Sequence, residues 1–151
     1  MIPKFRAWDS TKKEMFKDTF AITESGQVVV VEQEFVTSIP DYVFVDHLVI
    51  MQSTGLLDKN GKEIFEGDII RTSAYGCIVS FGEYTYFEDD DTQTTEIGFY
   101  LSFLNVKPAT YAPFDKYYWD NCEVIGNIYE NELDLIVYEL HKYNKELSEA
   151  E

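Results

Sequence analysis

Basic residues are scarce in this chain. It has 12 Lys and Arg against 28 Asp and Glu, which gives a formal net charge of −16 and a pI of about 4.3. A chain this acidic is repelled by nucleic-acid phosphates and by anionic membrane surfaces. We therefore expect neither direct nucleic-acid binding nor membrane binding.

Cysteine and histidine are almost absent, with two residues of each. Cys77 and Cys122 form no C-x-x-C pattern and have no basic neighbour that would lower a thiol pKa, so we expect buried, reduced thiols. His47 and His141 do not combine with them in a zinc-binding spacing. His47 adjoins Asp46 on an expected strand, where neighbours face opposite sides, which is poor geometry for a catalytic pair. We predict no catalytic residue, no metal and no cofactor.

Long apolar runs are also missing. The chain starts with MIPKFRAWDS, which lacks the apolar stretch of a signal peptide, and no segment approaches the ~20 apolar residues of a membrane helix. We therefore expect a cytoplasmic protein. The catalytic motifs G-x-S-x-G and H-E-x-x-H are absent, and so is the phosphate-binding P-loop. An enzyme of unknown class is accordingly the weakest of three functional hypotheses, and the other two are given at the end of this section.

Aromatic residues are abundant at 16% of the chain, with 11 Tyr and 11 Phe. Aromatic and β-branched side chains suit the pleated, half-buried surface of a sheet. Alternating patterns predict eight strands with no helix between them: 4–8, 14–22, 27–35, 42–52, 63–72, 77–87, 96–106 and 118–129. This pattern predicts a single all-β domain over residues 1–151, mainly an antiparallel barrel or sandwich.

The periodicity changes near the end of the chain. From Asn131, the expected N-cap, apolar residues recur at helical spacing and predict a C-terminal α-helix over about 131–147. The stripe has two readings that the sequence does not separate: packing on the chain's own barrel, or contact with a second copy in a homo-oligomer. Its apolar residues are Leu133, Ile136, Val137, Leu140 and Leu147.

The segment TGLLDKNGKEIFEGDII has polar residues around a glycine, which raises the question of a metal or phosphate loop. Counted from Asp58, the glycine stands at position 4 and not at 6, which excludes an EF-hand, and the segment is no P-loop. A two-residue Asn60-Gly61 loop would place like charges opposite each other, whereas a three-residue loop sets Asp58 against Lys62. We predict the second register, with Gly61 left-handed and a bend at Gly67.

The segment FEDDDTQTTE, residues 87–96, is the most acidic stretch, and no Lys or Arg occurs between Arg71 and Lys107. A block of like charge is typical of a solvated hairpin tip. A calcium site is the alternative, although these carboxylates lack the alternating spacing of a known loop. The residues concerned are Glu88, Asp89, Asp90 and Asp91.

A second cluster, TYAPFDKYYWDN over residues 110–121, concentrates aromatic side chains. Clustered Tyr and Trp are typical of protein interfaces and ligand grooves, and they also close the ends of barrels. As a surface for a protein partner, the candidate residues are Tyr111, Phe114, Tyr117, Tyr118 and Trp119.

Three segments together resemble the YopX family of phage and prophage proteins. GLLDKNGKEIFEGDII, preceded by IMQ at 50–52, resembles the family signature. KFRAWD at 4–9 resembles the opening strand, and EVIGNIYEN at 123–131 resembles the closing strand before the terminal helix. Ser53 and Glu132 depart from the pattern, where a larger residue and a proline are usual. The resemblance implies an all-β, barrel-like domain that acts inside a bacterial host, and it supplies no catalytic site.

Two functional hypotheses therefore rank above the hypothesis of an enzyme. The first is a non-catalytic phage or prophage accessory protein that binds an unknown phage or host protein and forms a homo-oligomer. The alternative uses the charge of the acidic segment: carboxylates on a rigid surface imitate a phosphate backbone and occupy a host DNA- or RNA-binding protein.

Overall fold

The computed structural model describes residues 2–72, 75–104 and 106–150, with every side chain in these ranges except those of Leu133 and Asp134. Antiparallel strands dominate, one sheet curls into a half-barrel, and a helix ends the chain, so the predicted fold class is confirmed. Contacts divide the chain into a small unit, Arg6–Ile50, and a large unit, Met1–Phe5 with Met51–Glu151. Each is described by itself, and the single domain stays a prediction.

The small unit consists of short antiparallel strands. Trp8 lies opposite Met15 in a hairpin, and the amide of Ser10 donates to the carbonyl of His47. A three-stranded sheet follows in the order β3-β4-β5, with Val30 between Phe20 and Val43. The strands that lie in or enter this unit are β1 (Phe5–Asp9), β2 (Glu14–Met15), β3 (Phe20–Ile22), β4 (Val28–Glu32), β5 (Asp41–Val45) and β6 (Leu48–Leu57).

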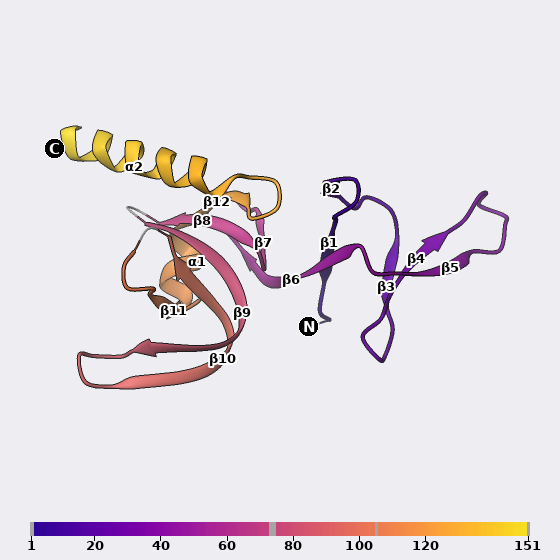
Figure 1. The fold of residues 1–151 in the computed structure, drawn as a ribbon, viewed down its shortest axis with the longest axis horizontal. Coiled ribbons are helices and arrows are strands. Elements are labelled where there is room, and N and C mark those ends of the chain that lie inside the picture. The colour runs from indigo at the N-terminus through magenta and orange to yellow at the C-terminus, as the bar shows by residue number, and fades with distance from the viewer. Residues whose placement is uncertain (1, 73–74, 105, 151) are drawn as a thin grey trace. The chain divides into compact units, whose positions relative to one another are not determined.

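The large unit is built on a five-stranded antiparallel sheet in the order β11-β10-β9-β8-β12, preceded by the hairpin of β6 and β7 (Figure 1). Its helices are α1 (Lys116–Asn121) and α2 (Leu133–Ala150), and no described helix is both long and apolar enough to cross a membrane. The further strands are β7 (Glu63–Phe65), β8 (Asp68–Thr72), β9 (Tyr75–Phe87), β10 (Gln93–Phe103), β11 (Tyr111–Pro113) and β12 (Cys122–Asn127).

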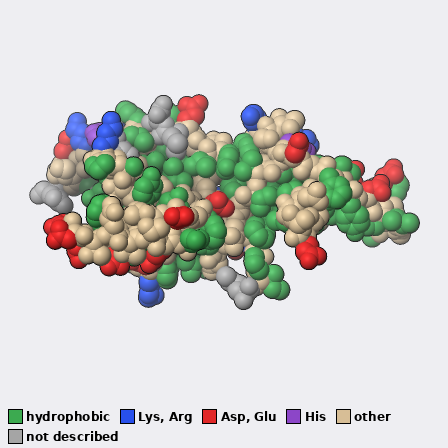
Figure 2. Space-filling model, turned by 60° about the horizontal axis from the view of Figure 1, so that its bottom comes forward, with side chains coloured by type: hydrophobic (Ala, Val, Ile, Leu, Met, Phe, Trp, Pro, Cys, Tyr) green, Lys and Arg blue, Asp and Glu red, His purple; other side chains and the backbone are tan. Residues whose placement is uncertain are grey.

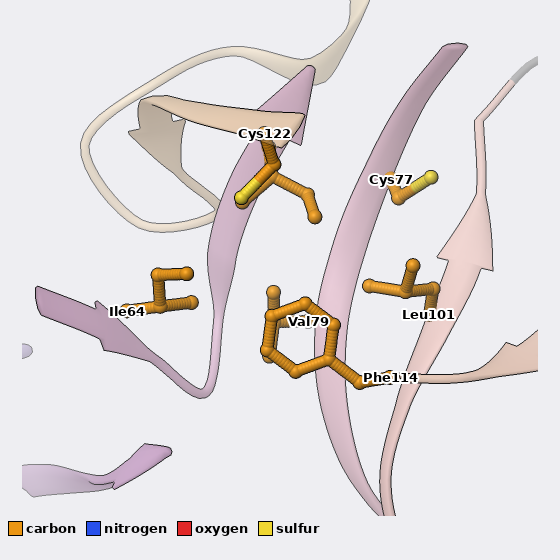
Figure 3. Close-up of a cluster of buried hydrophobic side chains, with 7 residues drawn as sticks. Ile64, Cys77, Val79, Leu101, Phe114 and Cys122 are labelled. Atoms are coloured by element: carbon orange, nitrogen blue, oxygen red, sulfur yellow. The ribbon is translucent and has the colours of Figure 1, made fainter. Parts of the chain in front are cut away.

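Strand alternation gives the large unit a core on each face of its sheet. On one face Ile70, Val79 and Leu101 are fully buried, and Tyr118 and Trp119 of α1 pack against the same core. Figure 3 shows Val79, Leu101 and Phe114 of this core. On the other face Ile69 packs under Ile136 and Leu140 of α2, with four partly buried neighbours: Ile78, Leu104, Ile125 and Ile128. The terminal helix therefore covers its own sheet with Ile136 and Leu140 of the predicted stripe, whereas Leu147 is exposed.

Several predicted elements are interrupted. Residues 14–22, 42–52 and 63–72 each hold two strands and not one. The last of these breaks at Gly67, whose φ of +86° and whose bonds to Val79 and Ile128 fix the predicted bend. The sequence also predicts turns at Tyr75-Gly76 and over 105–108. The first prediction is wrong because both residues belong to β9, and Asn105 of the second lies outside the described residues.

Two predictions near the end of the chain are also wrong. Tyr118–Asn121 was expected in a strand but forms most of α1, because its backbone turns at Asp115, whose carbonyl accepts from Tyr118 and Trp119. Asn131 is not the N-cap of α2. Its side-chain oxygen instead accepts from the amide of Asn127, and the first helical bond goes from Ile136 to the carbonyl of Glu132.

The β6–β7 hairpin has the register that its charges favour. Leu57 lies opposite Glu63, which places Asp58 across from Lys62. The amide of Gly61 donates to the carbonyl of Asp58 at 3.0 Å, and Gly61 has a φ of +84°. The segment is thus a three-residue turn with a left-handed glycine and not a ligand loop.

Candidate protein-interaction surface on the β9–β10 ribbon

The outer half of the β9–β10 hairpin stands apart from the remaining strands. The pair runs from Cys77 opposite Phe103 to Phe87 opposite Gln93, but β8 accompanies β9 only as far as Ile78. On the other side, β11 pairs only with Tyr100–Ser102. Residues 81–87 and 93–99, called the ribbon below, thus have no third strand among the described residues, and of their side chains only that of Tyr84 is buried.

Four tyrosines form a continuous row along one face of the ribbon and its base. Tyr84 stacks on Tyr86 with ring centroids 5.7 Å apart, and on Tyr100 at 4.8 Å. Tyr100 in turn meets the ring of Tyr111 edge-on at 5.8 Å. We call Tyr86, Tyr84, Tyr100 and Tyr111 the tyrosine ladder. Only one of them, Tyr111, belongs to the surface predicted from the sequence.

One carboxylate holds the outer end of the ladder in place. Glu96 accepts hydrogen bonds from the hydroxyls of Tyr84, at 3.0 Å, and Tyr86, at 3.3 Å. Burial, helped by Glu96, raises the pKa of Tyr84 to about 12, and burial with Glu96 and Glu88 also raises the pKa of Tyr86. Both phenols are therefore neutral donors at neutral pH. Tyr84 is buried between the rings of Tyr86 and Tyr100, so the ring faces open to a partner belong to the other tyrosines of the ladder.

A shallow cavity of about 320 Å³ opens beside the ladder, lined by Tyr84, Tyr100, Tyr111, Glu83 and Thr85. The negative charge of Asp115 also acts on Tyr84. Tyrosine faces next to carboxylates attract guanidinium and ammonium groups, because the ring quadrupole and the negative charges act in the same direction. The arrangement therefore fits a basic side chain of a protein partner.

The acidic segment is the tip of this ribbon. The amide of Glu88 donates to the carbonyl of Thr92, and the carboxylate of Asp89 accepts from the amides of Asp91 and Thr92, each at 2.9 Å. These amide bonds, first that of Asp91, lower the pKa of Asp89. Glu88, Asp89, Asp90 and Asp91 are exposed, and acidic side chains gather along one edge of this unit (Figure 2). Among the described residues, no group of three or more His, Cys, Asp or Glu is arranged to hold a metal ion.

The structure divides the predicted aromatic cluster. Phe114 is buried in the core, and Trp119 packs against it with ring centroids 5.9 Å apart. Tyr118 is partly buried against the same core, whereas Tyr117 is 66% exposed and lies outside the ladder. Three of the five predicted residues thus stabilise the fold, and only Tyr111 belongs to the tyrosine ladder.

Sequence reasoning missed Tyr84, Tyr86, Tyr100 and Glu96. The available signal was Tyr84 and Tyr86 at spacing i, i+2 in an expected strand, which places both side chains on one face. The sequence alone did not give the register in which β10 pairs with β9. Tyr100 and Glu96 could therefore not be placed beside Tyr84.

The two histidines lie outside the tyrosine ladder. His47 lies in the turn between β5 and β6, not on a strand as expected, and its Nε2 is 3.9 Å from Asp9 Oδ2. The other carboxylate oxygen of Asp9 accepts from the amides of Thr11 and Lys12, and the Lys12 bond is the main cause of the lowered pKa of Asp9. His141 is exposed on α2.

Both cysteines are free and fully buried in the core of the large unit (Figure 3). Burial raises the pKa of Cys77 to about 12 and that of Cys122 to about 11. Such thiols are protonated and unreactive at neutral pH. The expectation of buried, reduced thiols is confirmed.

Comparisons with known proteins agree with the three sequence segments. A family model described as YopX protein matches residues 4–134. The chain is also similar to the crystal structure of protein EF1440 from Enterococcus faecalis, with 30% sequence identity and a TM-score of 0.44. That match covers 87% of this chain and 96% of the other. A search of curated proteins finds no match.

Proposed function

Because this chain belongs to the YopX protein family, we propose that it is a phage or prophage accessory protein that acts in the bacterial cytoplasm by non-catalytic protein–protein contact. The partner is a phage or host protein with a basic segment, and the contact surface is the tyrosine ladder. The observation that carries this proposal is the row of four packed tyrosines along the ribbon and its base, beside Glu83 and Glu96.

Charge and ring geometry define the chemistry of the partner. The chain has no Lys or Arg between Arg71 and Lys107, so a basic segment meets no repulsion along the ribbon. An arginine over a tyrosine face gains roughly 0.5–1 kcal/mol at an exposed site and about 2 kcal/mol when it is desolvated. Several such contacts along an extended segment give specific binding whose strength falls with salt.

The experiment is capture from host lysate at low and high salt, followed by binding of a short arginine-rich peptide measured by fluorescence anisotropy. Tyr86→Ala and Tyr111→Ala should each weaken peptide binding by roughly tenfold, which corresponds to about 1.4 kcal/mol. Tyr117→Ala is the matched control, because this exposed tyrosine lies outside the ladder. Equal binding by all four proteins, or equal loss in the control, would contradict the proposal.

A second candidate function rests on the tip and not on the ladder. Glu88, Asp89, Asp90 and Asp91 are exposed, and the lowered pKa of Asp89 keeps that carboxylate charged well into the acidic range. We infer that such a tip would act as an acidic nucleic-acid mimic on a host DNA- or RNA-binding protein. In that case Asp90→Asn with Asp91→Asn abolishes capture, a polyanion displaces the captured protein, and the two ladder variants leave capture unchanged.

A further inference from the structure

The outer strand of the small unit's three-stranded sheet is unpaired along its free edge. In the order β3-β4-β5, β5 pairs with β4 on one side, and no described strand lies on the other. Tyr42 and Phe44 are 64% and 65% exposed, and Val43 is 40% exposed. The strand has no Lys, Pro or Gly, which are the residues that natural edge strands use to prevent pairing.

The small unit has little core of its own. Of its described apolar residues, only Ala7, Trp8, Val29 and Leu48 are buried. A unit of this size buries little apolar surface and is only marginally stable by itself, so a cover over its exposed apolar residues would stabilise it. A second copy of the same chain is the partner that is present, in equal amount, whenever the chain is made.

We propose that β5 pairs antiparallel with β5 of a second copy across a two-fold axis, which joins the two three-stranded sheets into one of six strands. This goes beyond the ladder and its partner. The strand is symmetric in residue type about Val43, which has an aromatic residue on each side, Tyr42 and Phe44. Such a strand is self-complementary, as an isologous two-fold interface requires.

Charge selects the register. Pairing centred between Val43 and Phe44 would set Asp41 opposite Asp46, and like charges across a strand pair are destabilising. Pairing centred on Val43 instead sets Val43 against itself and Tyr42 against Phe44 on each side of the axis. Two aromatic pairs then form on one face, and no carboxylate lies opposite another.

The apolar surface around β5 approaches in size the surface that a stable dimer buries. The β4–β5 loop adds Phe35, Val36 and Ile39, which are 66%, 95% and 89% exposed, and Figure 2 shows apolar side chains over this part of the chain. Aromatic side chains carry roughly 150–250 Å² each, so three of them at about two-thirds exposure offer on the order of 300–500 Å². With the two aliphatic residues, the surface approaches the roughly 800 Å² that a standard interface buries per partner.

The loop is also held in one conformation. The side chain of Gln33 donates to the carbonyls of Val36 and Ser38, and the hydroxyl of Ser38 accepts from the amide of Phe35. An ordered apolar loop loses little conformational freedom on docking.

The test introduces a positive or a negative charge at Val43, the residue that lies opposite its own counterpart in the second copy. Light scattering and native mass spectrometry at micromolar concentration should give a dimer for the unchanged chain. Val43→Lys and Val43→Glu should each give a folded monomer, with an unchanged circular dichroism spectrum, because two like charges would face each other. An equimolar mixture of the two variants should restore a dimer that contains one chain of each.

Ile97→Lys is the matched control, because Ile97 is 76% exposed on the ribbon of the large unit, and it should remain dimeric. A monomeric unchanged chain would overturn the proposal, and would indicate that the small unit is covered by its own chain or by a different protein. The proposal would also be overturned if Val43→Lys or Val43→Glu alone remained dimeric, or if their mixture formed no mixed dimer. A monomeric Ile97→Lys control would overturn it as well.

Discussion

The carboxylate of Asp58 accepts a hydrogen bond from the backbone amide of Val124 at 2.9 Å, although the two residues are 66 positions apart. Its other oxygen accepts from the amides of Asn60, at 2.9 Å, and Lys62, at 2.8 Å. The amide of Lys59 also donates to the carbonyl of Cys122 at 3.0 Å. One buried side chain thus shapes the β6–β7 turn and attaches it to β12.

This contact gives a physical meaning to the sequence segments that resemble the family. Asp58 belongs to GLLDKNGKEIFEGDII, and Val124 belongs to EVIGNIYEN. The opening segment joins the same unit through Lys4, whose carbonyl accepts from Ser53 and whose ammonium group is 3.0 Å from Glu63. These contacts give the recognisable residues a role in holding the fold together, whereas the ladder lies in the part of the chain that carries no such signature.

Removal of the Asp58 carboxylate should destabilise the large unit. Hydrogen bonds to charged groups contribute about 1.5–3 kcal/mol each and are not additive, so Asp58→Ala should lower the free energy of unfolding by about 2–4 kcal/mol. Urea unfolding monitored by Trp119 fluorescence in a Trp8→Phe background measures this unit. Asp90→Ala at the exposed tip is the control, with an expected change within about 0.5 kcal/mol. A similarly small change for Asp58→Ala would contradict the assigned role.

The same carboxylate should make stability depend on pH in acid. Burial by itself raises the pKa of Asp58, but the amides of Val124, Lys62 and Asn60 outweigh it and leave the pKa below its ordinary value of 3.8. The unfolded chain therefore takes up the proton more readily than the folded one. The contribution of Asp58 is complete above about pH 4 and is lost as the pH falls through the folded-state pKa.

Urea titrations between about pH 5 and pH 2 measure this dependence. The free energy of unfolding of the unchanged chain should fall more steeply than that of Asp58→Asn, which has no carboxylate to protonate at this position. Parallel curves for the two proteins would show that Asp58 does not contribute to the acid sensitivity.

Gly126 should tolerate no side chain, because Asn131 occupies the space where a Cβ would lie. Asn131 in turn accepts from the amide of Asn127, whose own side chain accepts from Tyr129 and Glu130. Gly126→Ala should therefore destabilise the chain by about 1–3 kcal/mol, as overpacking typically does. Thermal unfolding measures the effect. Gly98→Ala, where a Cβ meets nothing within 4 Å, should change stability little, and the added substitution Asn131→Ala should reduce the penalty at Gly126.

The strand pattern and the β6–β7 register followed from local rules. Alternation and charge pairing act between near neighbours, so Asp58 could be placed opposite Lys62 without knowledge of the remaining chain. The bend at Gly67 was predicted from its glycine, but the break at Asp46-His47 was missed because apolar residues flank it on both sides. Helix α1 was missed because its aromatic residues have high strand propensity, and tertiary packing of Tyr118 and Trp119 on the core overrides it.

The candidate surface was only partly predictable, for a similar reason. Tyr111 and the acidic tip were identified by composition, but the ladder exists only because β9 and β10 pair with Tyr84 opposite Glu96. That register is set by where the chain turns at the tip, between Phe87 and Gln93, which the sequence pattern alone did not define. The same limit applies to Phe114, which resembles an interface anchor in sequence and is a core residue in the structure.

The two buried thiols should react only when the large unit unfolds. Burial raises the pKa of Cys77 to about 12 and that of Cys122 to about 11, so the unfolded chain ionises both thiols more readily than the folded chain. Their contribution to stability is therefore complete below about pH 9 and is lost as the pH rises through the folded-state pKa values. At pH near 8 the native thiols should react with an aromatic disulfide reagent on the order of 100-fold more slowly than the same thiols in urea. Thr95→Cys, an exposed position on the ribbon, is the reactive control. Native reaction of Cys77 and Cys122 as fast as that of the control would mean that the core of the large unit is open to solvent.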